Sequence, residues 1–185
     1  MIRRCAAAFL VAILAAGCLS TPMIDPALQE TTLSAYRLNS GDRLRVTVFG
    51  QMDLSGEFNV DGSGLVALPL VEPVGARGQT PEEFARHLEA VLGQRLLRNP
   101  SVSVEVTQYR PFFILGEVNR PGQYPYVNGM TVKTAAAIAG GFTYRAATSQ
   151  VLITRQLGGD TLEGAATINA AVMPGDTVLV NERLF

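Results

Sequence analysis

The sequence lacks several residues on which enzymes and metal sites depend. It has no tryptophan, one histidine (His87) and two cysteines, Cys5 and Cys18, which both lie near the amino terminus. The rest of the chain therefore has no cysteine for a disulfide or a cysteine-ligated metal, and His87 has no second histidine with which to share a metal ion. No phosphate-binding loop or nucleophile elbow occurs either. We predict no catalytic residue, no cofactor and no metal.

Lysine is nearly absent, and no run of basic residues occurs. The chain has 15 lysines and arginines against 16 acidic residues, for a net charge of -1, and Lys133 is its single lysine. Without a basic run the chain cannot neutralise a row of phosphates, which excludes nucleic acid as a partner. Because 48% of the residues are hydrophobic and 17% are charged, the composition predicts a buried core and excludes a disordered chain.

Residues 1–17 have the order of features that a secretory signal has: two arginines, an apolar stretch and small residues before Cys18. The apolar stretch is shorter than the ~20 residues that span a bilayer, so we expect it to be removed. The segment from Leu14 to Cys18 resembles the lipobox of bacterial lipoproteins, although Ala15 stands where that motif usually has leucine.

The lipobox resemblance implies that Cys18 is acylated and anchors the chain to a membrane through lipid. Leu19 follows the cysteine, and the aspartate that retains enteric lipoproteins at the inner membrane is absent there. The resemblance therefore implies an outer-membrane location, lipid-anchored and facing the periplasm. The alternative is an ordinary secretory signal that leaves Cys18 as a free thiol, which is reactive in an oxidising compartment.

Residues 18–35 are polar and have no sustained period, which predicts a tether between the lipid and the folded part. Residues 43–49 alternate apolar and polar, which predicts a strand. A second strand that ends at Val60, a turn at residues 61–64 and a returning strand at residues 65–70 predict a hairpin.

A helix is predicted to begin after Thr80, because Thr80 can cap it, Pro81 suits its first position and Glu83 completes a capping box. The apolar residues that follow recur at helical spacing and form one stripe: Phe84, Leu88, Val91, Leu92 and Leu96. We expect the helix to end at Asn99 and a strand to follow at residues 101–109.

The pattern restarts at Pro111, where we expect a second unit. Residues 112–115 predict a strand, and an alanine-rich helix is expected from near Thr131 until the glycines at 140 and 141. Further strands are predicted at residues 151–154 and 178–180, with a turn at residues 158–160. Both units consist of strands around one helix, so the predicted fold class is α+β.

The order and spacing of these segments resemble a known family. Residues 36–110 resemble the amino-terminal domain of bacterial polysaccharide export lipoproteins, the outer-membrane auxiliary family. This likeness is carried by Tyr36 to Phe49, Val60 to Gly64, Leu68 to Leu70 and Asn99 to Val104. Residues 111–185 resemble the soluble-ligand-binding β-grasp domain that follows in that family, together with a terminal strand. This second likeness is carried by Leu115 to Tyr124, Met130 to Val132 and Ala139 to Gly141.

The resemblance implies a homo-oligomeric ring that conducts capsular polysaccharide or exopolysaccharide outward. It implies an inner-membrane polysaccharide co-polymerase as a partner. The chain is expected to be a short form without the carboxy-terminal transmembrane helix of other members, so a separate outer-membrane β-barrel is expected to supply the pore. The alternative is a monomeric envelope lipoprotein that binds a glycan or another soluble ligand.

Candidate glycan contacts are aromatic rings and arginines: Tyr124, Tyr126, Tyr144, Arg37, Arg43 and Arg45. The alternatives are that the tyrosines pack in a core or a subunit contact, and that the arginines, expected to alternate on one strand face, are solvated or ion-paired. Three aspartates beside glycines are expected to hydrogen-bond turn backbones and not to hydrolyse glycosides: Asp42, Asp61 and Asp176. Residues 40–42 and 174–176 share this turn chemistry, which does not establish a repeat.

Overall fold

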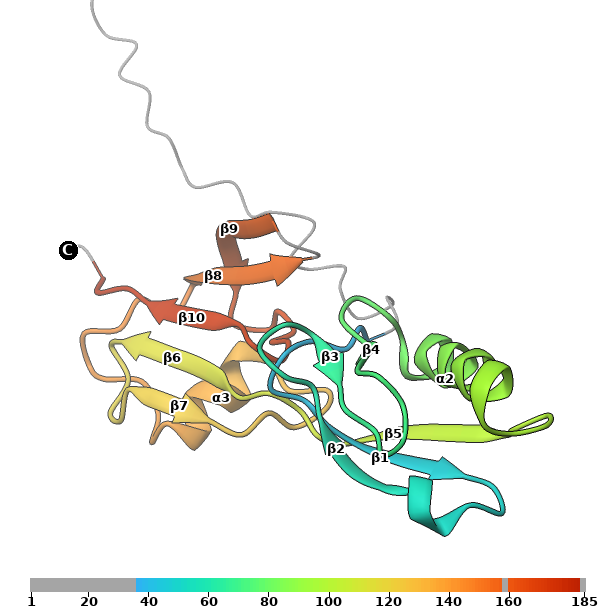
Figure 1. Cartoon of the computed structure of the whole chain (residues 1–185). Coiled ribbons are helices and arrows are strands. Elements are labelled where there is room, and N and C mark those ends of the chain that lie inside the picture. Colours follow the sequence, from blue (N-terminus) through green and yellow to red (C-terminus); the bar gives the residue numbers. More distant parts are fainter. Residues whose placement is uncertain (1–35, 158–159, 184–185) are drawn as a thin grey trace, which may run out of the picture.

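A computed structural model describes residues 36–157 and 160–183. The elements form two modules that follow one another along the chain (Figure 1). Each module has its own hydrophobic core. The first module runs from β1 to β5 and the second from β6 to β10. The predicted signal, the tether, the lipid attachment at Cys18 and most of the turn at residues 158–160 lie outside the described residues. The fold class is α+β, as predicted.

The first module is built on a three-stranded antiparallel sheet. Its central strand β1 (Arg43–Val48) lies between β2 (Gly56–Asn59) and β5 (Val102–Gln108), and the 3-10 turn η1 (Met52–Leu54) links β1 to β2. Every second residue of β1 is buried, so alternation in the sequence predicted both the strand and its inner face. The helix α2 (Pro81–Arg95) covers that inner face.

The start of α2 is the predicted capping box. The Glu83 N–H donates to the Thr80 hydroxyl at 3.2 Å, and the Thr80 N–H donates to the Glu83 carboxylate at 2.9 Å. This backbone hydrogen bond is the main reason that the pKa of Glu83 lies below its ordinary value. The helix ends at Arg95, earlier than the predicted Asn99. The next member of the apolar stripe, Leu96, is the C-cap residue and is exposed.

The predicted hairpin at residues 61–70 is mostly wrong. Its turn is present, since the Asp61 carboxylate accepts hydrogen bonds from the N–H groups of Ser63 and Leu65. However, β2 pairs with β1, while β3 (Leu65–Val66) pairs with β4 (Val74–Gly75). One isolated bridge joins the two predicted strands. The returning strand ends at Val66, and Pro69 has no N–H with which a ladder could continue to residue 70.

The second module has a five-stranded sheet in the order β7-β6-β10-β8-β9. Its strands are β6 (Phe112–Gly116), β7 (Gly122–Tyr124), β8 (Gln150–Leu157), β9 (Asp160–Thr167) and β10 (Thr177–Val180). Strand β10 runs parallel to β6, and the other neighbours are antiparallel. The helix α3 (Val132–Ile138) covers one face of the sheet and ends, as predicted, before two glycines with positive φ.

Strand β9 was not predicted. Its sequence contains Gly164, Ala165 and Ala166, residues that are depleted in strands, so the local pattern is weak. The strand forms because it pairs with β8 along its whole length, from Gln150 opposite Thr167 to Leu157 opposite Asp160. Among residues 36–157 and 160–183, no helix is long and apolar enough to cross a membrane.

Candidate functional site

The three-stranded sheet and the five-stranded sheet each have one face covered by a helix and one free face, and the two free faces differ in chemistry. The free face of the first sheet is polar. Arg45 lies opposite Glu57 on one neighbouring strand and Glu105 on the other. Its guanidinium contacts the Glu57 carboxylate at 3.2 Å, and the Arg43 Nε donates to Asn59 at 3.1 Å. These exposed arginines therefore have partners within their own chain.

Arg37 does not share this face, so the prediction that it alternates with Arg43 and Arg45 on one strand was wrong. It precedes β1 and extends to the start of α2, where its guanidinium donates to the Gly78 carbonyl at 2.6 Å and contacts Glu83 at 3.1 Å. The turn at Asn39 to Asp42 separates it from the strand. A period-2 pattern in the sequence does not reveal where a strand begins, and the turn breaks the alternation here.

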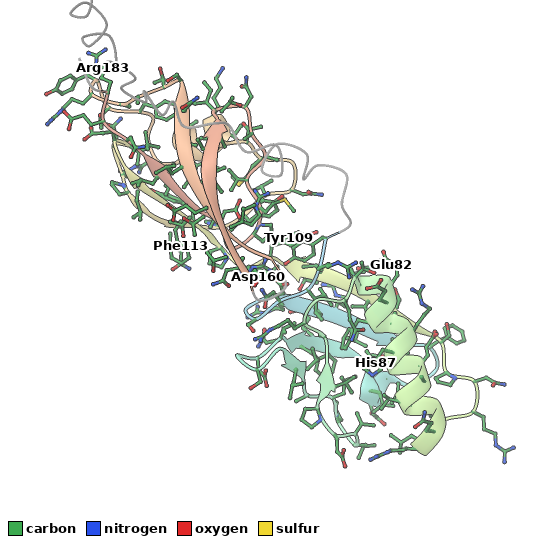
Figure 2. The ribbon with its side chains drawn as sticks, turned by 90° about the horizontal axis from the view of Figure 1, so that it is seen from above. Glu82, His87, Tyr109, Phe113, Asp160 and Arg183 are labelled. Carbon is green, nitrogen blue, oxygen red and sulfur yellow. The ribbon has the colours of Figure 1, made fainter. Side chains whose placement is uncertain are left out.

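The free face of the second sheet carries a cluster of apolar residues beside polar ones, since Gln123 and Thr177 lie on either side of Phe113. Phe113 and Leu115 of β6 and Leu179 of β10 are 40%, 44% and 36% exposed, and Leu179 lies directly opposite Leu115. Figure 2 shows Phe113 at the flank of the second module. We call Phe113, Leu115 and Leu179 the apolar face. Exposed apolar side chains that lie together on a sheet are a candidate surface for binding another molecule.

The three candidate tyrosines are not brought together in one site. Tyr124 stacks on the core residue Phe112, with ring centroids 6.0 Å apart, and donates its O–H to the Arg120 carbonyl. Tyr126 is half-buried, and burial is the main cause that raises its pKa. Tyr144 is 83% exposed and is the tyrosine with the most accessible ring of the three. Their glycan contacts stay a prediction.

An open cleft that the sequence did not predict lies beside Tyr144 in the chain. It measures about 720 Å³ and is lined by residues 146–150 and 181–183, most of which are polar. Beside it, the Arg145 guanidinium donates to the Glu182 carboxylate, and this hydrogen bond raises the pKa of Arg145. No motif marks the cleft, because it forms where a loop after α3 meets the residues after β10.

The described residues contain no cluster of three or more metal-ligating side chains. The three aspartates beside glycines lie in turns, as predicted, and accept hydrogen bonds from backbone N–H groups: Asp42, Asp61 and Asp176. His87 lies exposed on α2 and contacts the Gln79 amide at 3.2 Å.

Comparisons with known proteins agree with this two-module architecture. The family described as "Polysaccharide biosynthesis/export protein" matches residues 30–107, and the family described as "SLBB domain" matches residues 111–166. The chain thus falls in the class of proteins in which an export domain precedes an SLBB domain. Together with the relatives below, these two matches support a bacterial polysaccharide export protein.

Two curated relatives illustrate the family. The chain is 40% identical over 119 residues to the exopolysaccharide production protein ExoF of Rhizobium meliloti strain 1021, an alignment that covers 57% of this chain and 28% of that protein. It is 28% identical over 108 residues to the polysialic acid transport protein KpsD of Escherichia coli, covering 57% of this chain and 19% of that protein. The chain therefore spans about a quarter of these relatives or less, and their names refer to production and transport.

Proposed function

We propose that this protein is a periplasmic component of a capsular polysaccharide or exopolysaccharide export channel, anchored to the outer membrane. In this proposal Cys18 carries the lipid, residues 18–35 form the tether, and residues 36–110 and 111–185 form the export domain and the β-grasp domain. Copies of the chain assemble into a ring that forms or extends a conduit. An inner-membrane polysaccharide co-polymerase is the expected partner, and no catalysis is expected.

The observation that carries the proposal is the apolar face of the second sheet. Phe113, Leu115 and Leu179 leave apolar area in contact with water, and covering it on a neighbouring copy contributes ~25 cal/mol per Å². The first sheet offers no such gain, because its free face is already solvated and ion-paired. The second sheet is therefore the better candidate for a subunit contact.

The mass of the full chain in mild detergent tests the ring. We expect a multiple of the chain mass for the unaltered protein and a single copy for Leu115→Asp combined with Leu179→Asp, because two charges on the apolar face prevent its burial. The matched control is Thr47→Asp combined with Ser103→Asp, a directly opposite pair on the free face of the first sheet. A monomeric unaltered protein would contradict the ring.

Two further experiments test the anchor and the transport role. Mass spectrometry of the amino-terminal peptide is expected to find acyl chains on Cys18, and Cys18→Ser is expected to release the protein from the membrane.

Deletion of the gene is expected to lower the polysaccharide on the cell surface while precursor accumulates inside. Unchanged surface polysaccharide would refute an export function.

The open cleft favours a second candidate function, a monomeric lipoprotein that binds a glycan. Its lining offers hydroxyl and amide groups for hydrogen bonds to sugar hydroxyls, namely Thr148, Ser149, Gln150 and Asn181. A monomer that binds the purified polysaccharide, with binding lost in Asn181→Ala, would support this candidate over the ring.

A further inference from the structure

Two turns with the same geometry lie at the border between the modules. The turn at residues 39–42 leads into β1, and the turn at residues 173–176 leads into β10. In each, the carboxylate of the final aspartate accepts a hydrogen bond from the N–H of the first residue, at 2.8 Å for Asp42 and 2.7 Å for Asp176. The glycine before each aspartate has a positive φ, of 93° and 85°. The two turns, which have the same turn residues in the sequence, thus also have the same hydrogen bond and a glycine with positive φ.

Both aspartates are buried, but their arginine partners differ in origin. Asp176 is held within its own module by Arg155, whose Nε and Nη2 donate to the two carboxylate oxygens at 2.9 and 2.7 Å. Asp42 instead binds Arg110, which lies between β5 and β6. The backbone N–H of Arg110 donates to Asp42 at 3.0 Å, and its Nη1 lies 3.5 Å from the same carboxylate. The first turn is therefore bonded to a residue of the connection between the modules.

The side chain of Arg110 also lies against the second turn. A Cβ on Gly175 would sit 2.5 Å from the Arg110 Nε, so the absence of a side chain at Gly175 is what lets the two approach. The Gly175 N–H donates to the carbonyl of Pro111 at 3.0 Å. At its other end, the guanidinium donates to the Tyr36 hydroxyl at 2.8 Å and lies over the Tyr36 ring. One arginine thus contacts both modules.

A line of three aromatic rings crosses the same border. Tyr36 packs edge-on against Tyr109 with centroids 4.9 Å apart, and Tyr109 packs edge-on against Tyr126 of the second module at 5.4 Å. Figure 2 shows the modules end to end, with Tyr109 and the first residue of β9, Asp160, where they meet. The ring contacts resist rotation about the connection at residues 109–111, and Pro111 fixes its own φ.

We infer that Arg110 is a positioning residue that holds the two modules in a single relative orientation. A guanidinium suits this role because its planar fork can bond to one module while its stem packs on the other. The inference concerns one chain and does not rest on the proposed conduit. If copies do form a ring, a fixed orientation is what allows the ring to close, since a head-to-tail contact closes only at one rotation.

Distances between spin labels on the two modules test this inference. Ala90 on α2 and Ala137 on α3 are exposed and can be replaced by cysteine for labelling. The full chain carries Cys5→Ser and Cys18→Ser so that no other thiol reacts, and labelled chains are diluted with unlabelled ones so that only distances within a chain are measured. We expect one narrow distance distribution for this protein and its loss, by broadening or splitting, in Arg110→Ala.

Matched controls separate positioning from general damage. Gly175→Ala places a methyl group against Arg110 at φ +85°, and Gly64→Ala places one against Arg77 at φ +84°, inside the first module. The backbone strain is therefore alike, but only Gly175→Ala is expected to change the distance distribution. Arg77→Ala, which removes the Arg77 contacts to Ser40 and Gly62 within the first module, is expected to leave it narrow.

The inference is overturned if Arg110→Ala keeps the narrow distribution while circular dichroism shows a folded chain, or if the starting protein is already broad. It is also overturned if Gly64→Ala broadens the distribution as much as Gly175→Ala. Should Arg110→Ala fail to fold, Gly175→Ala decides, because it displaces the arginine without removing its charge from the border. The mass of the same samples is measured separately, so a failure of the ring proposal does not alter this outcome.

Discussion

The two larger sheets of this protein are alike on one face, which a helix covers, and differ on the other. Helix α2 and helix α3 each cover one face, where Phe84 and Phe112 are fully buried. The free face of the first sheet carries Arg43 and Arg45 with their partners. The free face of the second sheet carries the exposed residues Phe113, Leu115 and Leu179. Antiparallel sheets ordinarily leave a polar face in water. The first sheet follows this rule. In the second sheet Leu115 and Leu179 lie on the parallel pair of β6 and β10, and parallel strands are ordinarily covered on both faces, so this surface has the most to gain from a partner.

The comparison assumes that the two covered faces contribute equally to the stability of the protein. Truncation of a core side chain tests this assumption and is expected to have the largest effect on the free energy of unfolding. We expect Phe84→Ala and Phe112→Ala each to lower the free energy of unfolding by about 3–5 kcal/mol, because each removes a fully buried ring and leaves a cavity. Denaturant titration of each variant measures this. A cost at one site of less than half that at the other would show that the covered faces are not equivalent.

A second test sharpens the comparison at the border of the modules. Tyr36→Phe is expected to cost about 1–3 kcal/mol at neutral pH, because the Asp42 carboxylate loses a donor at 2.6 Å and Arg110 loses an acceptor. Burial, with a smaller effect of Asp42, raises the pKa of Tyr36 above its ordinary value of 10.0. The folded state then holds this proton more tightly, so its contribution is complete below pH 10 and is lost as the pH rises further.

Measurements of stability against pH in the alkaline range check whether the contribution of Tyr36 is lost as the pH rises. The unaltered protein should lose stability more steeply than Tyr36→Phe, while Tyr144→Phe, on an exposed ring, should follow the unaltered protein. Identical alkaline slopes for the unaltered protein and Tyr36→Phe would contradict the linkage.

Substitutions on the free faces are expected to have a smaller effect on stability. The Arg45–Glu57 pair is exposed, so a double-mutant cycle with alanine at both positions should give a coupling of about 0.2–1 kcal/mol that falls with added salt. Leu115→Ser should change stability little and should lower self-association, with no dependence on salt. A salt-independent coupling at Arg45, or unchanged association in Leu115→Ser, would remove the contrast between the faces.

The smallest effect distinguishes the two covering helices. Helix α2 begins with a capping box that contains Glu83, whereas the box of α3 consists of Thr131 and Thr134 and cannot titrate. Because hydrogen bonding lowers the pKa of Glu83, its contribution is complete above pH 4.5 and is lost as the pH falls through the lowered value. Amide NMR signals of Thr80 should therefore shift in acid while those of Thr131 do not, and equal shifts would contradict this account.

Local signals predicted the parts of the fold that depend on local physics. The alternation in β1, the capping box at Thr80 and the glycines that end α3 all act within a few residues, and the structure confirms them. The predicted hairpin around the turn at residues 61–64 and the missed strand β9 depend on partners elsewhere in the chain. Pairing between strands is decided by which edges meet, and that information is not in the segment itself.

The candidate surfaces were less predictable for the same reason. Tyr124, Tyr126 and Tyr144 look alike in sequence, but one stacks in the core, one packs at the border and one faces solvent. The shared chemistry of the two Gly-Asp turns was visible, yet nothing near Asp42 indicates Arg110. The apolar face was hidden because Phe112 to Leu115 is a continuous apolar run, which does not reveal that alternate residues lie on a free face.

The position of β10 has a consequence for how the second module forms. This strand lies between β6 and β8 at the centre of the sheet, although β6 and β10 are far apart in the chain. Until residues 177–180 arrive, the hairpin of β8 and β9 has nothing to join it to β6 and β7. While a ribosome or a translocation pore still encloses residues 177–180, the sheet of the second module cannot form cooperatively. Loss of these four residues would divide the sheet in two.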